Sequence, residues 1–208
     1  GKFEADEIPA ATQIFTPNWI VKYMVQNTVG RIYLDNNPNT TLAYKEKWQY
    51  LVEPAEPTPA EAILHYNELT DLKVADLACG SGHILNECFD LLYDLYITEG
   101  YTRVEAITHI FRDNLTGIDL DPRAQQLSLF ALTLKACQRD HSFADAHCLP
   151  RVLTMPKVQL PLPLPTDTRL AVEIDAVNTL LRDADSLGSI MKFDLTPAAR
   201  EWVVSLAE

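Results

Sequence analysis

The segment from residue 74 to residue 85 constrains this chain most, because an apolar run, a small-residue loop and an amphipathic helix follow one another in it. The apolar run ends at Asp76, and Gly80 and Gly82 lie in the loop. Glycine has no Cβ, so it adopts positive φ and lets backbone approach a ligand closely. The helix behind the loop has free N–H groups at its N-terminus. The segment predicts a strand–loop–helix unit that binds a nucleotide-like cofactor.

The same order recurs further along the chain. Residues 115–120 form a second apolar run that contains Asp119, and Asp121-Pro122 then caps and opens another helix. Residues 151–155 are a candidate third strand. Strands that alternate with helices predict an α/β fold with a parallel sheet and right-handed crossovers. The helix that starts at Asp121-Pro122 is expected to bury one apolar face, made of Ala124, Leu127, Phe130, Ala131 and Leu134.

Helices flank this central region on both sides. Thr16 is the expected N-cap of a first helix, with Pro17 at its first position and an end near residues 36–39. Shorter helical stretches are predicted around residues 42–51 and 60–69, and two more after the Pro-rich segment 156–165, at 170–184 and 197–207. We therefore expect three parts: an N-terminal helical segment (1–71), an incomplete α/β core (72–160) and a helical extension (161–208).

Composition limits the class of protein. Hydrophobic residues make up 47% and charged residues 22%, and no apolar run is long enough to span a membrane. The four cysteines are widely spaced, which favours reduced thiols and a cytoplasmic location. The formal net charge of −12 argues against this chain holding a nucleic-acid backbone by itself.

The two acidic strand ends narrow the choice of ligand. Asp119, at the carboxyl edge of a parallel sheet, is placed to bind a ribose diol. The third glycine of a dinucleotide-binding loop is missing, since residues 84–86 are Ile, Leu and Asn. A loop of this kind also occurs as a tight turn without a ligand. With Asp76 and Asp119 beside it, we favour a ligand that has a ribose but no phosphates.

Three motifs then resemble those of N6-adenine DNA methyltransferases. Residues 76–83 (D-L-A-C-G-S-G-H) are similar to motif I, usually D-P-A-C-G-S-G, with Leu77 in place of the common proline. Residues 15–17 (F-T-P) resemble motif X, and residues 117–122 (G-I-D-L-D-P) resemble motif II. Together they cover most of residues 10–137 in the order X–I–II. The sequence around them, at residues 12–17, 82–85, 89–93 and 123–127, resembles the phage-defence methyltransferases of the BREX (Pgl) type in particular.

The resemblance implies a Rossmann-like fold and S-adenosylmethionine as the cofactor. It implies that Asp76 faces the methionine ammonium, that Asp119 binds the ribose hydroxyls and that Leu120 lies against the adenine. The other implied cofactor-binding residues are Cys79, Gly80 and Gly82 through their backbone, Thr16 and Pro17 at the methionine end, and Asp145 as the nearest candidate for the acid that reads the adenine amino group. Asp121 is expected to be a helix cap rather than a ligand.

The catalytic motif of the family is missing from this chain. Family members place an Asn/Asp-Pro-Pro-Tyr/Phe loop against a flipped-out adenine. Residues 36–39 (N-N-P-N) lack the second proline and the aromatic residue, and they precede motif I. We therefore assign no catalytic residue and expect cofactor binding without turnover. The helical pattern continues to the last residues, so we read the chain as a piece of a longer polypeptide whose other regions hold double-stranded DNA and any defence-system partner proteins.

Two other functions remain open from the sequence. One is a methyltransferase that acts on RNA, protein or a small molecule, and the other is a catalytically inactive domain that serves assembly. No metal site is predicted, because the spacing of Cys137, His141, His147 and Cys148 fits no common zinc pattern. Trp19, Trp48 and Tyr50 are interpreted as packing residues rather than base-stacking platforms.

Overall fold

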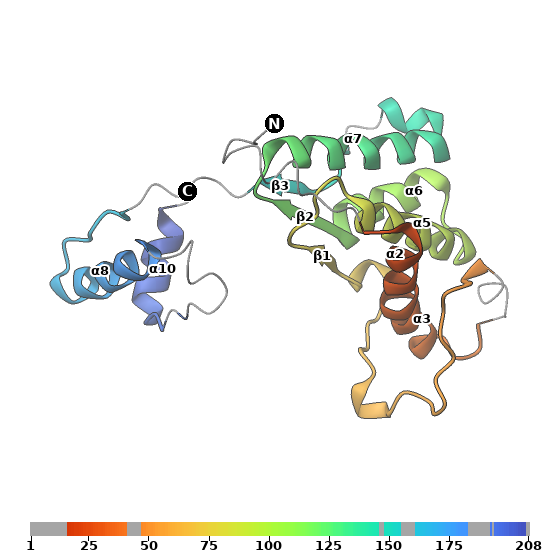
Figure 1. Ribbon diagram of the computed structural model, residues 1–208, viewed down its shortest axis with the longest axis horizontal. Helices are drawn as coiled ribbons and strands as arrows, with labels where there is room; N and C mark the ends of the chain where they lie inside the picture. Colours follow the sequence, from red (N-terminus) through yellow and green to blue (C-terminus); the bar gives the residue numbers. More distant parts are fainter. Residues whose placement is uncertain are drawn as a thin grey trace, which may run out of the picture. The chain divides into compact units, whose positions relative to one another are not determined.

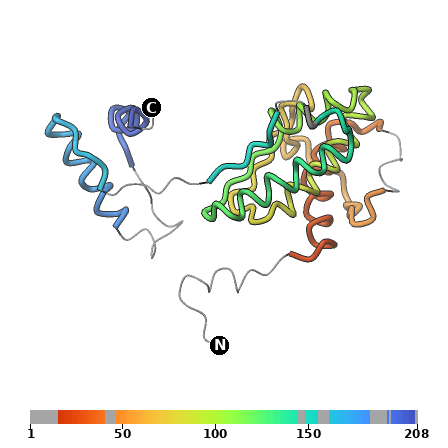
Figure 2. Tube along the Cα trace, turned by 90° about the horizontal axis from the view of Figure 1, so that it is seen from above, coloured from red at the N-terminus to blue at the C-terminus, as the bar shows by residue number. Residues whose placement is uncertain are grey.

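The computed structural model describes residues 16–40, 47–145, 148–154, 161–182, 192 and 194–206. The chain divides into two compact units, residues 1–155 and 156–208. Figure 2 follows each unit along its Cα trace. The three-part division expected from the sequence stays a prediction. In the described part of the chain, no helix is both long and apolar enough to cross a membrane.

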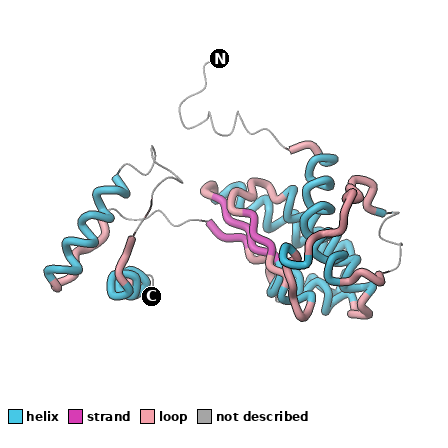
Figure 3. Tube along the Cα trace, turned by 90° about the horizontal axis from the view of Figure 1, so that it is seen from below, coloured by secondary structure: helices cyan, strands magenta, loops and turns pink. Residues whose placement is uncertain are grey.

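A three-stranded parallel sheet lies at the centre of the first unit. Its strands β1 (Val74–Asp76), β2 (Leu115–Asp119) and β3 (Val152–Thr154) pair in the order β1-β2-β3 and lie side by side in Figure 3. The parallel sheet predicted from the sequence is thereby confirmed. The first unit also contains the short helices η2 (Ala60–Ala62), η3 (Leu69–Asp71) and η5 (His141–Asp145), and helix α6 (Arg103–His109) with its π-helical continuation η4 (Ile110–Asn114).

One face of the sheet is covered by α5 (His83–Thr98), the helix that follows the glycine loop (Figure 1). The contact is close, because a Cβ built on Gly117 of β2 would lie only 2.6 Å from Cδ1 of Leu85. The buried side of α5 contributes large side chains to the core, among them Leu85, Phe89, Leu92, Leu95 and Tyr96. Residues on the opposite face of the sheet, Ala75 and Leu153, are exposed. Helix α5 therefore packs on the sheet directly after the glycine loop and supports the end of that loop.

The first helix begins one residue later than predicted. Its segments α2 (Asn18–Val25), η1 (Gln26–Gly30) and α3 (Arg31–Asn36) form one continuous rod, with a π-helical middle (Figure 1). The N-cap is Pro17 rather than Thr16, because the Pro17 carbonyl accepts the first two helical hydrogen bonds, at 2.9 and 3.2 Å. The predicted end near residues 36–39 is confirmed.

The predicted helix over residues 60–69 is wrong. Only the short turns η2 and η3 form there, and the chain between them is irregular. Hydrogen bonds from the end of α3 contact this segment instead: Asn36 Nδ2 donates to the backbone carbonyl of Leu64 at 2.8 Å, and Nδ2 of the C-cap residue Asn37 donates to the side-chain hydroxyl of Tyr66 at 3.2 Å. Leu64 is exposed, whereas Leu69 is buried and Tyr66 packs against the core. Of the stretch predicted at 42–51, residues 41–46 lie outside the described residues and residues 48–51 form a turn.

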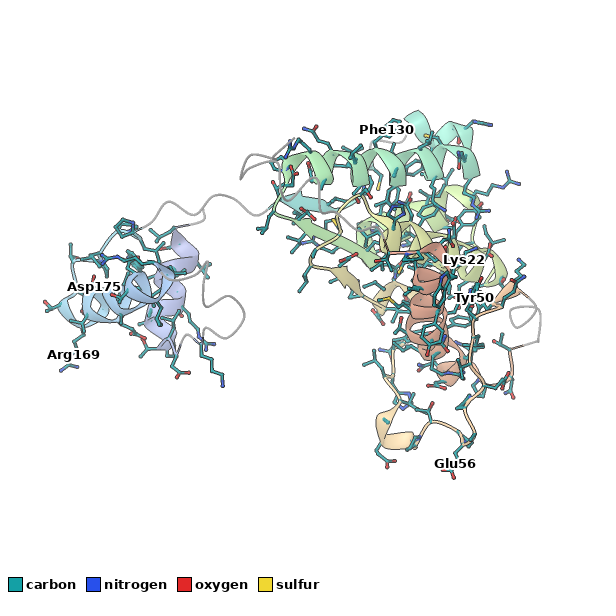
Figure 4. All side chains as sticks on the ribbon, in the orientation of Figure 1. Lys22, Tyr50, Glu56, Phe130, Arg169 and Asp175 are labelled. Atoms are coloured by element: carbon teal, nitrogen blue, oxygen red, sulfur yellow. The ribbon has the colours of Figure 1, made fainter. Side chains whose placement is uncertain are left out.

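Of the apolar face predicted for helix α7 (Pro122–Arg139), Ala124 is buried and Ala131 is partly buried, while the larger side chains lie outside the core. The buried residues of α7 recur every four positions and all but one are small, namely Ala124, Ser128, Leu132 and Ala136. The predicted core residues Leu127, Phe130 and Leu134 are exposed, and Phe130 lies on the outer side of the helix (Figure 4). Close approach to the glycine loop accounts for the small residue at Ser128, because a Cβ built on Gly82 would lie 3.2 Å from Cα of Ser128 and a larger side chain would not fit there.

Replacing Phe130 with alanine is therefore expected to change the free energy of unfolding by no more than about 0.5 kcal/mol, as at other exposed positions. Its side chain is 66% exposed, so little buried apolar area is lost. Urea denaturation followed by circular dichroism measures the change. A loss of about 3 kcal/mol or more, the usual cost of truncating a buried phenylalanine, would contradict the orientation of α7.

The second unit contains two helices, α8 (Thr168–Arg182) and α10 (Pro197–Ser205), close to the ranges predicted. Thr196 caps α10 by accepting the N–H of Ala199, and Glu173 of α8 accepts both the N–H and the hydroxyl of Thr196. The buried Asn178 pairs with the backbone of Leu162 through both its amide nitrogen and its oxygen. Glu173 thus joins α8 to the start of α10, and Asn178 joins α8 to the segment ahead of it.

Candidate cofactor site

The glycine loop closes directly onto the sheet. The Cys79 N–H donates to the carbonyl of Ile118 at 2.9 Å, which continues the pairing of β1 with β2, and the Gly82 N–H turns back to the Cys79 carbonyl at 2.8 Å. Gly80 and Gly82 adopt φ of +53° and +84°, in the region that favours glycine. The loop therefore depends on both glycines, although their surroundings differ.

Gly80 faces open space, because no atom of the described residues, apart from its own neighbours in the chain, lies within 4 Å of a Cβ built on it. Gly82 instead lies against α7, where the same construction places a Cβ 2.4 Å from Oγ and 3.2 Å from Cα of Ser128. Gly80 thus leaves the surface of the loop clear for a ligand, whereas Gly82 lets two segments of the protein meet. Ser128 was missed by the sequence reasoning, and its only signal is a small residue four positions after Ala124 and four before Leu132.

Asp119 joins the glycine loop to the segment that opens α7. Its Oδ2 accepts the Gly80 N–H at 2.8 Å, and its Oδ1 accepts the N–H of Asp121 at 2.8 Å. Asp121 in turn accepts the N–H of Arg123 at 2.9 Å, which confirms the predicted cap of α7. The structure therefore brings together the acidic end of β2 and the loop after β1, as expected for neighbouring parallel strands.

Asp76 and Asp119 make this edge of the sheet acidic. Partial burial raises the pKa of the Asp76 carboxyl, and the negative charge of Asp119 raises it further, against the lowering effect of the Ala78 N–H. Burial and the same two carboxylates also raise the pKa of the Cys79 thiol. Charged Asp76 is thus held at an energetic cost that a positively charged ligand would relieve.

This cost predicts that Asp76→Asn stabilises the ligand-free chain at neutral pH. A carboxyl whose pKa is raised by folding stabilises the fold at low pH and loses that contribution as the pH rises through its folded pKa. We therefore expect the variant to melt at a higher temperature than the wild type at pH 7, with the difference vanishing below about pH 4. Melting curves across this range measure it, and a variant that is less stable at pH 7 would contradict the assignment.

The backbone N–H groups of the loop are largely engaged inside the protein. Those of Cys79, Gly80 and Gly82 donate to Ile118, Asp119 and Cys79 respectively, so in this structure none of the three is free to donate to a ligand. Among the described residues, the buried hydroxyl oxygen of Ser81 and the amide oxygen of Asn86 have no hydrogen-bond partner. Contact with a ligand would therefore use the open surface of Gly80 together with the side chains around it.

The side chains predicted around the loop lie at different places. Leu120 is 81% exposed, directly after Asp119, and is accessible for contact with a flat ring. Thr16 and Pro17 are exposed at the start of α2. The next residue, Asn18, lines a cavity of about 330 Å³ with His83 and Asn86 of α5, which brings the start of motif X to the helix behind the glycine loop.

Asp145 is not brought to this edge by the chain order. It ends η5, which precedes β3, whereas the glycine loop and Asp119 stand where strands end. Its side chain lies outside the described residues, so its assignment stays a prediction. Phe15 and His147 also lie outside them. Among the residues that are described, no group of three or more His, Cys, Asp or Glu side chains is arranged to hold a metal ion.

The structure also places the N-N-P-N segment at residues 36–39 and two of the tryptophans considered in the sequence analysis. The amide nitrogens of Asn36 and Asn37 donate to the carbonyls of Ile32 and Tyr33 one turn back, so this N-N-P-N segment ends a helix. Trp48 is buried, as predicted for a packing residue. Trp19 is 57% exposed, so the packing interpretation is wrong there, because α2 turns that side chain outward.

Comparison with known proteins identifies relatives of this site. No protein-family model matches the chain. Over 143 residues it is 46% identical to "Adenine-specific methyltransferase BrxX" of Escherichia coli O9:H4 (strain HS), a match that covers 66% of this chain and 12% of that protein. The chain is homologous to part of an adenine-specific methyltransferase. The chain is also 37% identical over 170 residues to "Adenine-specific methyltransferase PglX" of Lacticaseibacillus casei (strain Zhang). This match covers 77% of this chain and 14% of PglX.

These matches confirm the family resemblance drawn from motifs X, I and II. The chain spans about one eighth of the length of BrxX and PglX. The acidic edge and the glycine loop described above therefore belong to a segment homologous to a small part of these methyltransferases.

Proposed function

We propose that this chain is the S-adenosylmethionine-binding portion of a DNA adenine-N6 methyltransferase of a restriction-modification or phage-defence system. One observation carries the proposal: the Asp119 carboxylate binds the glycine loop at an acidic sheet edge, in a chain whose relatives are named adenine-specific methyltransferases. The proposed fold is an incomplete Rossmann-like methyltransferase sheet with the α2–α3 rod ahead of it.

The charges and the space at the site fit this cofactor. S-adenosylmethionine carries a positive sulfonium and a positive ammonium and has no phosphates, and Asp76 and Asp119 supply negative charge at the same edge. Asp76 would hold the ammonium, Asp119 the ribose hydroxyls and the exposed Leu120 one face of the adenine. The open surface at Gly80 leaves room for the approach. Bound there, the cofactor supplies an electrophilic methyl group.

The residues of this chain bind and orient, and they do not act on the target base. No Asn/Asp-Pro-Pro-Tyr/Phe loop is present in the sequence, and the net charge of −12 opposes binding of a phosphate backbone. We infer that further regions of a longer protein supply the catalytic loop and hold double-stranded DNA. A soluble, cytoplasmic protein that acts within a defence system follows from the same proposal.

Expression of the complete gene in a host without N6-methyladenine tests the proposal. Single-molecule sequencing of the host DNA is expected to show N6-methyladenine at one recognition sequence, and the Asp119→Ala form is expected to show a strongly reduced level. Complete absence of modified adenine, with the protein folded and S-adenosylmethionine bound, would exclude the DNA substrate and favour another methyl acceptor or an assembly role.

A further inference from the structure

In the described part of the chain, Gly80 has one short hydrogen bond, to Asp119, beside a long contact of 3.9 Å from the Cys79 thiol to its carbonyl. It carries no side chain, it sits at φ +53°, and no atom lies within 4 Å of the position that a Cβ would occupy. Its N–H donates to Oδ2 of Asp119 at 2.8 Å. A glycine in open space has the largest backbone freedom of any residue, so a single strong hydrogen bond has a large influence on its conformation.

The Asp119 carboxylate is suited to this task because it is itself fixed. Its second oxygen accepts the N–H of Asp121 at 2.8 Å, and Asp121 caps the first turn of α7. Hydrogen bonds to an ionised acceptor are stronger than neutral ones. The Asp119 carboxylate thus connects Gly80, a residue with large backbone freedom, to the start of the 18-residue helix α7.

We propose that Asp119 is a positioning residue that clamps Gly80, in addition to any contact that it makes with a ribose. A carboxylate offers roughly four lone-pair sites, and the two backbone donors use one on each oxygen. Sites remain for hydroxyl groups, so the clamp stays closed while a diol binds. The proposal rests on the function proposed above, and it adds that Asp119 shapes the loop before any ligand arrives.

The clamp and the ribose contact make different predictions for a ligand without hydroxyls. S-adenosylhomocysteine and its 2′,3′-dideoxy analogue share the amino acid and the adenine and differ only in the diol. If Asp119 acted through the diol alone, Asp119→Ala would weaken binding of the first ligand and leave the second unchanged. With the clamp, we expect Asp119→Ala to weaken the dideoxy analogue as well, by at least about threefold.

Amide hydrogen exchange of the ligand-free chain gives a second, independent readout. Loss of one charge-assisted hydrogen bond is expected to speed exchange of the Gly80 amide by about tenfold or more in Asp119→Ala. Asp119→Asn keeps only one carboxylate-like oxygen for two backbone donors. The exchange rate of its Gly80 amide should therefore fall between the rates of the wild type and Asp119→Ala. Asp121→Ala is the matched control, because it removes a neighbouring carboxylate and the α7 cap but leaves the Gly80 bond in place.

The outcomes separate the two proposals. Faster Gly80 exchange in Asp119→Ala but not in Asp121→Ala, with weaker binding of the dideoxy analogue, supports the clamp. Unchanged Gly80 exchange in both Asp119 variants overturns it. If the wild type binds neither ligand, the proposed function fails, and the exchange rates alone then decide whether the clamp exists. Should Asp119→Ala fail to fold, the comparison of Asp119→Asn with Asp121→Ala decides the same question.

Discussion

Replacing Asn114 with alanine is expected to lower the free energy of unfolding of the first unit by about 3 kcal/mol, at roughly 1 kcal/mol per lost hydrogen bond. Asn114 is buried, and its amide nitrogen donates to the carbonyls of Leu69 and Leu72 at 2.8 and 2.9 Å. Its oxygen accepts the hydroxyl of the buried Tyr96 at 2.8 Å. The variant removes these bonds from the Leu72 carbonyl and the Tyr96 hydroxyl in the core, next to the start of β2, while the Leu69 carbonyl keeps the N–H of Leu72 at 3.2 Å.

Asn27 provides a control, because its side chain makes the same number of hydrogen bonds in a solvent-exposed position. Its amide nitrogen also donates to two carbonyls, those of Tyr23 and Tyr50, and its oxygen accepts the N–H of Val52. These groups are exposed, so water replaces the lost bonds and Asn27→Ala should cost no more than about 1 kcal/mol. Urea denaturation of both variants measures the difference. Equal losses would contradict the central position of Asn114 in the core.

Gly82→Ala is the second substitution with a large expected effect, a loss of about 3 kcal/mol from positive φ and overpacking together. The backbone there sits at φ +84°, and the new Cβ would lie 2.4 Å from Oγ of Ser128. Ser128→Ala removes that oxygen, so the double variant should be more stable than the sum of the two single losses implies, by about 1 kcal/mol.

Gly80→Ala is the matched comparison in the same loop. Its φ of +53° carries a conformational cost of roughly 1–2 kcal/mol, but the new Cβ meets no atom within 4 Å. We therefore expect a smaller loss of stability than for Gly82→Ala, together with weaker binding of S-adenosylmethionine because the methyl group occupies the open surface. Equal destabilisation by the two substitutions would contradict the different surroundings of these glycines.

Local signals in the sequence predicted the elements that form the site. Asp76 ends a strand and Asp121 caps a helix, because each of these features rests on the chemistry of neighbouring residues. The parallel sheet followed from the alternation of strands and helices. These features need no knowledge of distant contacts.

Other features depend on contacts between segments far apart in the chain. The buried face of α7 is set by the approach of Gly82 to Ser128, and hydrophobicity alone favoured the side that carries Phe130. Likewise, the segment around Leu64 is held by the amide of Asn36, 28 residues away, rather than by its own helical pattern. The bond from Gly80 to Asp119 spans 39 residues and links two motifs that the sequence shows only separately.

Calorimetric titration of the chain with S-adenosylmethionine tests the central claim most directly. The account predicts a saturable heat with one site per chain, an affinity at least tenfold weaker in Asp119→Ala, and an affinity unchanged in Phe130→Ala, where the substitution lies on the exposed side of α7. Absence of heat from the wild type, or equal affinities of the wild type and Asp119→Ala, would contradict a cofactor site at this edge of the sheet.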